Sequence, residues 1–534
     1  MNKLMITAVG CLAAGAVFAN VKPANVFTDN MVLQRDKVVP VWGTADAGEE
    51  VTVSFAGQTT KATADADGKW EARLRPLTAS KENRVLTIEG KNKVELKDVL
   101  VGDVWLCSGQ SNMEMNFSWG VYDGDAFKKE AAEKFDQIRC IKVAKGKASW
   151  PRQDVQTDQP WARTTAQEGI SKWTATGYFF ARKLVQELDI PVGIIDNNWG
   201  GCRIEPFVAL CGIRGCEPKT PVNVNLKSAF LAQVAAADPS TPEGKRRFER
   251  YIADMKEFLA TAECAVAAGK VPVADMPVMP SVDGMTTQYN SMIAPIVRFP
   301  IAGVIWYQGC SNGSEGETYT EKTEMLVRGW REMWGYEFPF YWVQLASFTA
   351  KTGDPKGGNG YALIRDAQRL ALKRLNKTGM AVTIDVGNEK DIHPKAKVFV
   401  GERLAAWALK NDYGKDVVPS GPLFRDASGL GTDKVELAFD YVGSGLVAGE
   451  KDNLSNAPVK LTPEAKLVGF AAELTDGKFV WADAVILGDK VVVTAAGKKI
   501  KNVRYGYRAN AMGLANLYNK ESLPASPFAT QNNW

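Results

Sequence analysis

Histidine and cysteine are rare in this sequence, and its net charge is small. Its 534 residues include one histidine and eight cysteines, and the formal net charge is +4. So small a charge gives no indication of binding to nucleic acid or to an anionic membrane surface. Beyond the N-terminal segment no apolar run is long enough to cross a bilayer, so we expect no membrane insertion. Without Cys-x-x-Cys pairs or a second histidine a zinc site is disfavoured, and we predict no metal and no cofactor.

The first 19 residues have the pattern of a signal peptide. Lys3 is followed by an apolar, small-residue stretch that ends in Val17-Phe18-Ala19. This pattern predicts cleavage after Ala19 and export to a periplasm or the extracellular space. Lipid attachment at Cys11 is the less favoured alternative, because the apolar stretch before it is short. Seven cysteines remain after cleavage, and this odd number leaves at least one free thiol.

The length and the changes of pattern along the chain predict several domains. Residues 20–100 and 413–534 contain short alternating stretches broken by turn residues, which is typical of antiparallel β-domains. Residues 101–412 alternate apolar strands with amphipathic helices, which predicts a parallel sheet covered on both faces. Residues 207–288 break this rhythm and are interpreted as an insertion. The predicted fold class is therefore α/β, with an antiparallel β-domain at each end.

Five apolar stretches are expected to form strands of the central sheet: VWLCSG, PVGIIDNNWGG, IAGVIWYQG, PFYWVQLA and GMAVTIDVG. Ligands of such sheets bind beyond the carboxyl ends of the strands. The chemically distinctive residues of this chain follow those ends.

The single histidine, His393, is the first of these residues. Acyl transfer by a serine needs a base that can take and return a proton near neutral pH, and imidazole is the usual group. His393 lies in GNEKDIHPKAK, directly after an expected strand. A surface histidine is the alternative interpretation.

Two serines are candidate partners of His393. Ser111 lies in VWLCSGQSNMEM, at an expected tight turn after a strand. Ser311 lies in Gly309-Cys310-Ser311-Asn312-Gly313, which matches the G-x-S-x-G elbow of hydrolases. That elbow requires a helix directly after the turn, whereas here a helix is expected only from about Tyr319. Ser311 is therefore the weaker candidate.

The motifs GQSN, WGG, WYQG-x-SN and DIHP, in this order, resemble those of SGNH-type hydrolases, and more closely those of the sialate O-acetylesterase group. Longer stretches also resemble that family, among them NVFTDNMVLQRDKVVPVWG, YNSMIAPIVRFPIAGVIWYQG and ANLYNKESLPASPFATQNNW. The resemblance covers nearly the whole mature chain and is weakest in the insertion. It implies an SGNH-like fold for residues 101–412.

The resemblance also implies roles for individual residues. Ser111 would attack an acetyl carbonyl, and His393 would accept its proton and pass it to the leaving sugar oxygen. The Ser111 N–H, the Gly200 N–H and the Asn312 side-chain amide would form the oxyanion hole. Asp391 is the expected carboxylate that orients His393, although the Asp-x-His spacing requires a tightly curled loop. A backbone carbonyl could serve instead, and Asp385 is another possible carboxylate.

Two cysteines depart from the family pattern next to the implied oxyanion residues. Cys310 stands where relatives often have Glu, and Cys202 stands where Thr or Ser is common. We hypothesise a disulfide between them, with two buried free thiols as the alternative.

Gln110, Arg203 and Gln308 are candidate substrate-binding residues. Arginine suits a carboxylate such as that of sialic acid, but a structural ion pair of Arg203 with Glu205 or another neighbour is the favoured interpretation. Four aromatic residues near the motifs are expected to lie mostly in the core: Trp105, Trp199, Trp306 and Tyr307.

Together these features predict a serine esterase that removes O-acetyl groups from sialic acid through an acetyl-enzyme. The alternatives are an esterase of acetylated xylan or another glycan, and a non-catalytic carbohydrate-binding protein. The expected partner is an O-acetylated sugar, and the sequence does not define an oligomeric state.

Overall fold

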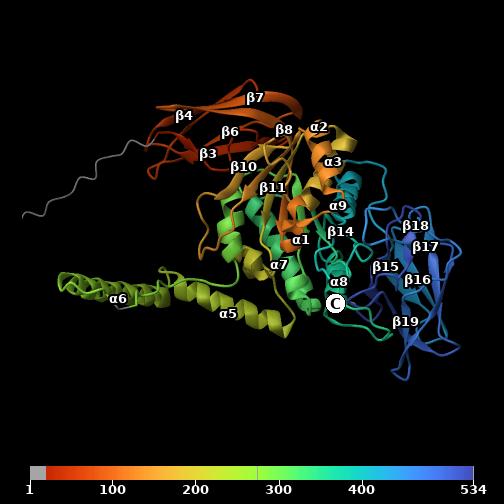
Figure 1. Ribbon diagram of the computed structural model, residues 1–534. Coiled ribbons are helices and arrows are strands. Elements are labelled where there is room, and N and C mark those ends of the chain that lie inside the picture. Colours follow the sequence, from red (N-terminus) through yellow and green to blue (C-terminus); the bar gives the residue numbers. More distant parts are fainter. Residues whose placement is uncertain (1–19, 273–274, 533–534) are drawn as a thin grey trace, which may run out of the picture.

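The computed structural model of the protein describes residues 20–272 and 275–532. Its parts are an N-terminal β-sandwich, a central α/β body from which two helices project, and a C-terminal β-region (Figure 1). The predicted signal peptide and Cys11 lie outside the described residues. Among the helices of the described ranges, none combines the length and apolar character needed to span a membrane.

The N-terminal region is a two-layered structure whose strands pair antiparallel except β2 with β8, and one long strand joins it to the central sheet. Strand β8 (Lys93–Gly109) pairs with β7 through its first half and enters the central sheet with its second half. The predicted domain boundary at residue 100 lies inside this strand. The other strands are β1 (Lys22–Pro23), β2 (Val32–Gln34), β3 (Val39–Thr44), β4 (Glu50–Phe55), β5 (Gln58–Thr63), β6 (Lys69–Leu74) and β7 (Ser80–Glu89).

The central sheet has the strand order β10-β9-β11-β8-β12-β13-β14. All neighbouring pairs in it are parallel except β10 with β9, so the sheet is mixed rather than purely parallel. The five predicted stretches form β8, β11, β12, β13 and β14, whereas β9 and β10 were not predicted. The bounds are β9 (Ile138–Val143), β10 (Thr157–Arg163), β11 (Val192–Asn198), β12 (Gly303–Tyr307), β13 (Phe340–Val343) and β14 (Thr378–Ala381).

Helices cover both faces of this sheet. On one face, Trp105 of β8 packs against Phe180 of α3 (Ala175–Leu188), and α3 packs against α9 (Lys397–Asn411). On the other face, Trp306 of β12 packs against Trp330 of α7 (Glu317–Trp334), next to α8 (Gly360–Ala371). Trp105, Trp306 and Tyr307 are buried, as expected for core residues.

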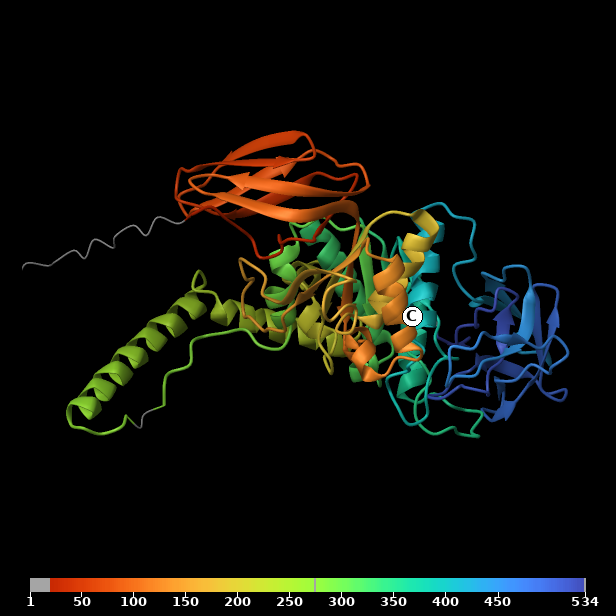
Figure 2. The same ribbon diagram turned by 45° about the horizontal axis from the view of Figure 1, so that its top comes forward.

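The predicted insertion contains α4 (Leu210–Gly215), α5 (Pro221–Ala237) and α6 (Pro242–Ala267). Helix α6 extends away from the body, and the chain then returns toward it (Figure 2). A carboxylate from the central region holds the base of this arm: Glu321 of α7 accepts hydrogen bonds from the N–H groups of Lys219 and Thr220 at the start of α5. A negative charge there complements the unpaired N–H groups of a helix N-terminus.

The C-terminal region is built from short strands around an apolar core of its own, which includes Val435, Phe470 and Tyr505. Its sheets have the orders β15-β16-β22-β21, β18-β17-β24 and β20-β19-β23-β25. The strands are β15 (Leu423–Ser428), β16 (Lys434–Asp440), β17 (Leu446–Glu450), β18 (Lys460–Leu461), β19 (Phe470–Leu474), β20 (Phe479–Trp481), β21 (Asp483–Leu487), β22 (Lys490–Thr494), β23 (Ile500–Tyr505), β24 (Leu517–Asn519) and β25 (Phe528–Ala529).

Candidate active site

Ser111 lies at the sharp turn where β8 gives way to the short helix α1 (Ser111–Glu114). Gly109, the last residue of the strand, has φ +139°, and a Cβ on it would lie 2.3 Å from the carbonyl oxygen of Tyr307. Only glycine fits there. As the first residue of α1, Ser111 carries an N–H that has no acceptor within the helix.

The structure brings Ser111 and His393 together. Ser111 Oγ lies 2.9 Å from His393 Nε2, within hydrogen-bonding distance. His393 reaches this position on a long loop, residues 382–396, which connects β14 to α9. Ser111 stands beyond the carboxyl end of a central strand, where ligands of such sheets bind. Serine and imidazole therefore have the geometry of a nucleophile and its base.

Asp391 lies beside His393 because the loop between them curls tightly, as the Asp-x-His spacing requires. Its Oδ1 accepts a hydrogen bond from the His393 N–H at 2.9 Å and lies 3.5 Å from His393 Nδ1. Asp385, the other carboxylate considered, is buried and forms a two-pronged ion pair with Arg403. Of the two, Asp391 is therefore the one placed to orient the imidazole.

The pKa of His393 lies below its ordinary value of 6.5. Burial is the main cause, and the positive charge of Lys397 adds to it, while the Asp391 carboxylate acts in the opposite direction. The imidazole is consequently neutral at pH 7 and can accept a proton.

Two of the three predicted oxyanion donors lie next to each other. A Cβ on Gly200 would lie 3.3 Å from Ser111 Cβ, so the backbone at residue 200 closely approaches the serine. The Gly200 N–H donates a 2.6 Å hydrogen bond to the Glu114 carboxylate, which in turn pairs with Lys145 at 2.5 Å. The Ser111 and Gly200 N–H groups are thus candidate donors, and that of Gly200 is engaged by Glu114.

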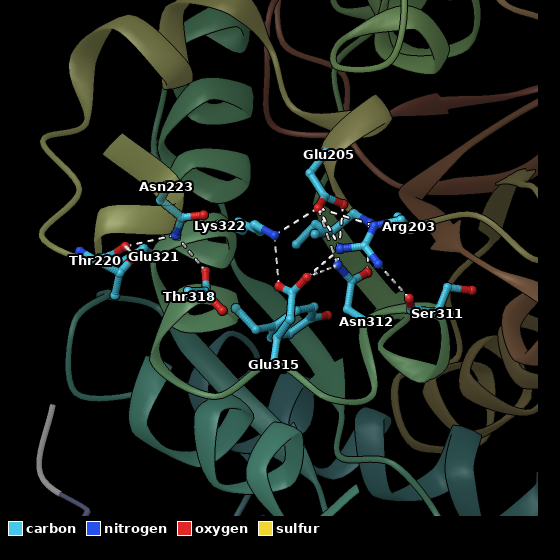
Figure 3. Close-up of polar contacts among 12 residues, drawn as sticks. Arg203, Glu205, Thr220, Asn223, Ser311, Asn312, Glu315, Thr318, Glu321 and Lys322 are labelled. Carbon is cyan, nitrogen blue, oxygen red and sulfur yellow. Dashed lines mark hydrogen bonds and ion pairs between the residues drawn. The ribbon is translucent and has the colours of Figure 1, made fainter. Parts of the chain in front are cut away.

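The third predicted donor, Asn312, belongs to a buried polar cluster (Figure 3). Its side-chain NH₂ donates to Glu205 at 3.3 Å and to Glu315 at 3.2 Å. Its Oδ1 accepts from the Ile204 N–H and from Gln308. Both hydrogens of the amide are committed to carboxylates, so this arrangement does not support the predicted role of Asn312 in an oxyanion hole.

The same cluster balances its charges internally. Lys322 lies 2.8 Å from both Glu205 and Glu315, and Arg203 pairs with the same two carboxylates. Burial alone would raise the pKa of Glu205, but Lys322 and Arg203 outweigh burial and hold the pKa below its ordinary value. The cluster joins the loops that follow β11 and β12.

The three predicted substrate-binding residues differ in accessibility. Gln308 is fully buried and hydrogen-bonded to Cys202, Asn312 and Tyr319, so this arrangement does not support its predicted contact with substrate. Gln110 is also buried, and its side-chain oxygen accepts from the N–H groups of Gly309 and Ser311. These two glutamines support the turn after β12.

Arg203 is about half exposed, with 49% of its side-chain surface accessible. It forms the ion pair with Glu205 that was the alternative to substrate binding. Ser311 does not join the histidine; its hydroxyl donates to the Gly201 carbonyl at 3.0 Å.

The hypothesised disulfide between Cys202 and Cys310 is not formed. Both cysteines are free, as are the other five within the described residues. The Cys202 thiol contacts Gln288 Nε2 at 2.8 Å, whereas the Cys310 thiol faces Tyr361 and Asn112. The two sulfur atoms therefore have separate surroundings. In residues 20–272 and 275–532, no group of three or more His, Cys, Asp and Glu side chains is arranged to hold a metal ion.

Three residues beside the pair were not among the predicted site residues. Trp119, which is 41% exposed, contacts the His393 ring edge to face at 5.6 Å. Asn112 and Lys397 are buried and hydrogen-bonded to each other. Trp119 lies eight positions after Ser111, and this proximity is the sequence signal that could have indicated it. The role of a buried lysine has no comparable signal.

Comparison with known proteins identifies the class of this protein. Residues 243–410 match the family model for carbohydrate esterases described as sialic acid-specific acetylesterases. The sialate O-acetylesterase of Mus musculus is 28% identical over 74% of this chain and 75% of its own, and that of Homo sapiens is 27% identical over 75% and 73%. The protein is a carboxylic ester hydrolase.

A solved structure extends the likeness to nearly the whole chain. The crystal structure of a carbohydrate acetylesterase from Xanthomonas citri is 32% identical and has a TM-score of 0.75. The alignment covers 96% of this chain and 100% of that protein. The chain therefore belongs to the carbohydrate acetylesterase family that includes the sialate O-acetylesterases.

The polar cluster gives a prediction for stability. Lys322→Met removes a cation with 2% side-chain exposure and leaves Glu205 and Glu315 short of a partner. We expect the free energy of unfolding to fall by about 3–5 kcal/mol, the usual cost of breaking a buried ion pair. Urea unfolding followed by tryptophan fluorescence measures this change.

Lys61→Met is the matched control, because Lys61 pairs with Glu50 on the surface, where ion pairs contribute about 0–1 kcal/mol. Equal effects of the two substitutions would contradict a structural role of the cluster.

Proposed function

We propose that this esterase removes O-acetyl groups from sialic acid by a serine mechanism in which Ser111 is the nucleophile and His393 the general base. The 2.9 Å contact between Ser111 Oγ and His393 Nε2 carries the proposal. The substrate is suggested by the family model and by the curated relatives, which are sialate O-acetylesterases. An SGNH-like arrangement of residues 101–412 and export of the mature chain are part of the same proposal.

In the first half of the reaction, Ser111 Oγ attacks the carbonyl carbon of the acetyl group as His393 Nε2 takes the hydroxyl proton. The bond between the carbonyl carbon and the sugar oxygen then breaks, and His393 returns the proton to that oxygen. The products are the free sugar hydroxyl and an acetyl ester on Ser111. Asp391 holds the ring and stabilises the imidazolium that forms.

In the second half, water attacks the carbonyl carbon of the acetyl-Ser111 ester while His393 takes a proton from it. The bond between that carbon and Ser111 Oγ then breaks, His393 returns the proton to Oγ, and acetate leaves. The negative oxygen of each tetrahedral intermediate needs donors fixed in advance. The N–H groups of Ser111 and Gly200 are the proposed donors. For Gly200 to serve, the carbonyl oxygen of the substrate must displace the Glu114 carboxylate from its N–H.

The role of Ser111 is tested by substitution. We expect Ser111→Ala to lower kcat/KM for 4-nitrophenyl acetate by at least about 10³-fold, because the nucleophile is lost. Ser311→Ala serves as control and should stay within a few-fold of the parent protein, since its hydroxyl contacts a backbone carbonyl. Retained activity in Ser111→Ala, with loss in Ser311→Ala, would reverse the assignment.

The role of Asp391 is tested by the pH profile. The Asp391 carboxylate raises the pKa of His393, so Asp391→Asn should lower that pKa and move the acid limb of kcat/KM to lower pH. We expect kcat to fall by on the order of 10²-fold, less than the roughly 10⁴-fold loss for a buried triad carboxylate. The smaller loss is expected because Asp391 is 40% exposed. If neither quantity changes, a group other than Asp391 orients the imidazole.

The substrate is tested by acetate release from a panel of O-acetylated sialic acids and acetylated xylo-oligosaccharides. We expect the highest kcat/KM for a sialic acid ester. Preference for the xylo-oligosaccharides would indicate a plant glycan as the substrate of the same serine mechanism. Binding of sugars without acetate release would favour a non-catalytic protein.

A further inference from the structure

Lys397, the first residue of α9, is a buried lysine next to the proposed catalytic pair. Its side chain has no exposed surface, and its Nζ donates a 2.6 Å hydrogen bond to Asn112 Oδ1. The ammonium also lies 5.1 Å from the centre of the Tyr307 ring. Burying an ammonium group is unfavourable unless it is well paired, and the hydrogen-bonding partner here is a neutral amide. Because this burial is unfavourable, we look for a functional role of Lys397 in addition to packing.

Asn112 connects this lysine to both members of the pair. It directly follows Ser111 in the chain, and its Nδ2 donates a 3.0 Å hydrogen bond to the carbonyl of Ile392, the residue before His393. A side-chain amide has one accepting end and one donating end, whereas a lysine can only donate. Lys397 therefore fixes the accepting end of Asn112 toward itself and turns the donating end toward the histidine loop.

We propose that Lys397 is a positioning residue of this active site. Through Asn112 it holds the histidine loop against the Ser111 turn, and its positive charge favours the neutral, proton-accepting form of His393. The proposal rests on the function proposed above for Ser111 and His393.

The electrostatic surroundings agree with this geometry. Lys397 lowers the pKa of His393, in addition to the larger effect of burial. Burial lowers the pKa of Lys397 itself to about 7, against the opposing influences of Cys310 and Asp391. Lys397 therefore gains positive charge as the pH falls toward the range in which His393 titrates.

The groups that face His393 and Lys397 come from several elements. Asp391 precedes the imidazole on its own loop, and Trp119 packs against the ring. The others are Ser111 and Asn112 of α1, Tyr307 of β12, and Cys310 of the turn after β12. Among these, Asp391 is the acidic group whose effect on the His393 pKa opposes that of Lys397.

The single histidine of the chain makes the test direct, because its Cε1–H proton gives one imidazole signal in an NMR titration. In Lys397→Met we expect a higher His393 pKa than in the parent protein, since a nearby positive charge is removed. The acid limb of kcat/KM for 4-nitrophenyl acetate should move to higher pH by the same amount. We expect kcat to fall on the order of 10- to 100-fold, with a smaller change in KM, because the loop loses its alignment.

Lys390→Met is the matched control, since Lys390 is an exposed lysine of the same loop. Solvent and salt screen its charge, so the His393 pKa and kcat should both stay at the parent values. Asn112→Ala separates the two effects of Lys397. It removes the tether and leaves the lysine in place, so kcat should fall while the His393 pKa stays below 6.5.

An unchanged His393 pKa together with an unchanged kcat in Lys397→Met would overturn the proposal. If that variant does not fold, Asn112→Ala decides the question: a loss of kcat of about 10-fold or more supports the tether, and an unchanged kcat refutes it. These outcomes are distinct from failure of the proposed function, which would show as retained activity in Ser111→Ala.

Discussion

The hydrogen bond between Ser111 and His393 joins side chains that are 282 positions apart in the chain, and the arrangement of the site depends on it. The two ends are fixed by different means. Ser111 follows a central strand whose last residue must be glycine, so its position is set by the rigid sheet. His393 lies on the long loop before α9, and a long loop keeps one conformation only if many contacts offset the entropy of ordering it.

Contacts from both the central and the C-terminal regions order that loop. Arg403 of α9 pairs with Asp385 at its start, and the Ser347 hydroxyl donates to the carbonyl of Ile384. From the C-terminal region, Asn453 donates a 2.9 Å hydrogen bond to the carbonyl of Gly387. The C-terminal β-region therefore does more than extend the molecule, because it supports the loop that carries the imidazole. This dependence gives a structural reason for one chain to contain both regions.

The sequence was sufficient for features that arise from local patterns, and insufficient for features that depend on distant partners. Apolar runs ending in glycine or polar turns correctly predicted five strands of the central sheet, and the motifs led to Ser111 and His393. The side-chain amide of Asn312 is oriented by the carboxylates of Glu205 and Glu315. No local sequence pattern indicates the orientation of such an amide. The prediction of a disulfide between Cys202 and Cys310 was wrong for the same reason. That two loops are neighbours does not determine the directions of their thiols.

Glu114 provides an acceptor for the proposed oxyanion site when no substrate is bound. A backbone N–H fixed in a partly buried site needs an acceptor, and the carboxylate of Glu114 satisfies that of Gly200. The same N–H cannot serve an oxyanion until that carboxylate withdraws. Lys145 already pairs with Glu114 at the protein surface, so the displaced charge keeps a partner. In the proposed mechanism, acetyl binding thus exchanges one acceptor for another without leaving the Glu114 charge unpaired.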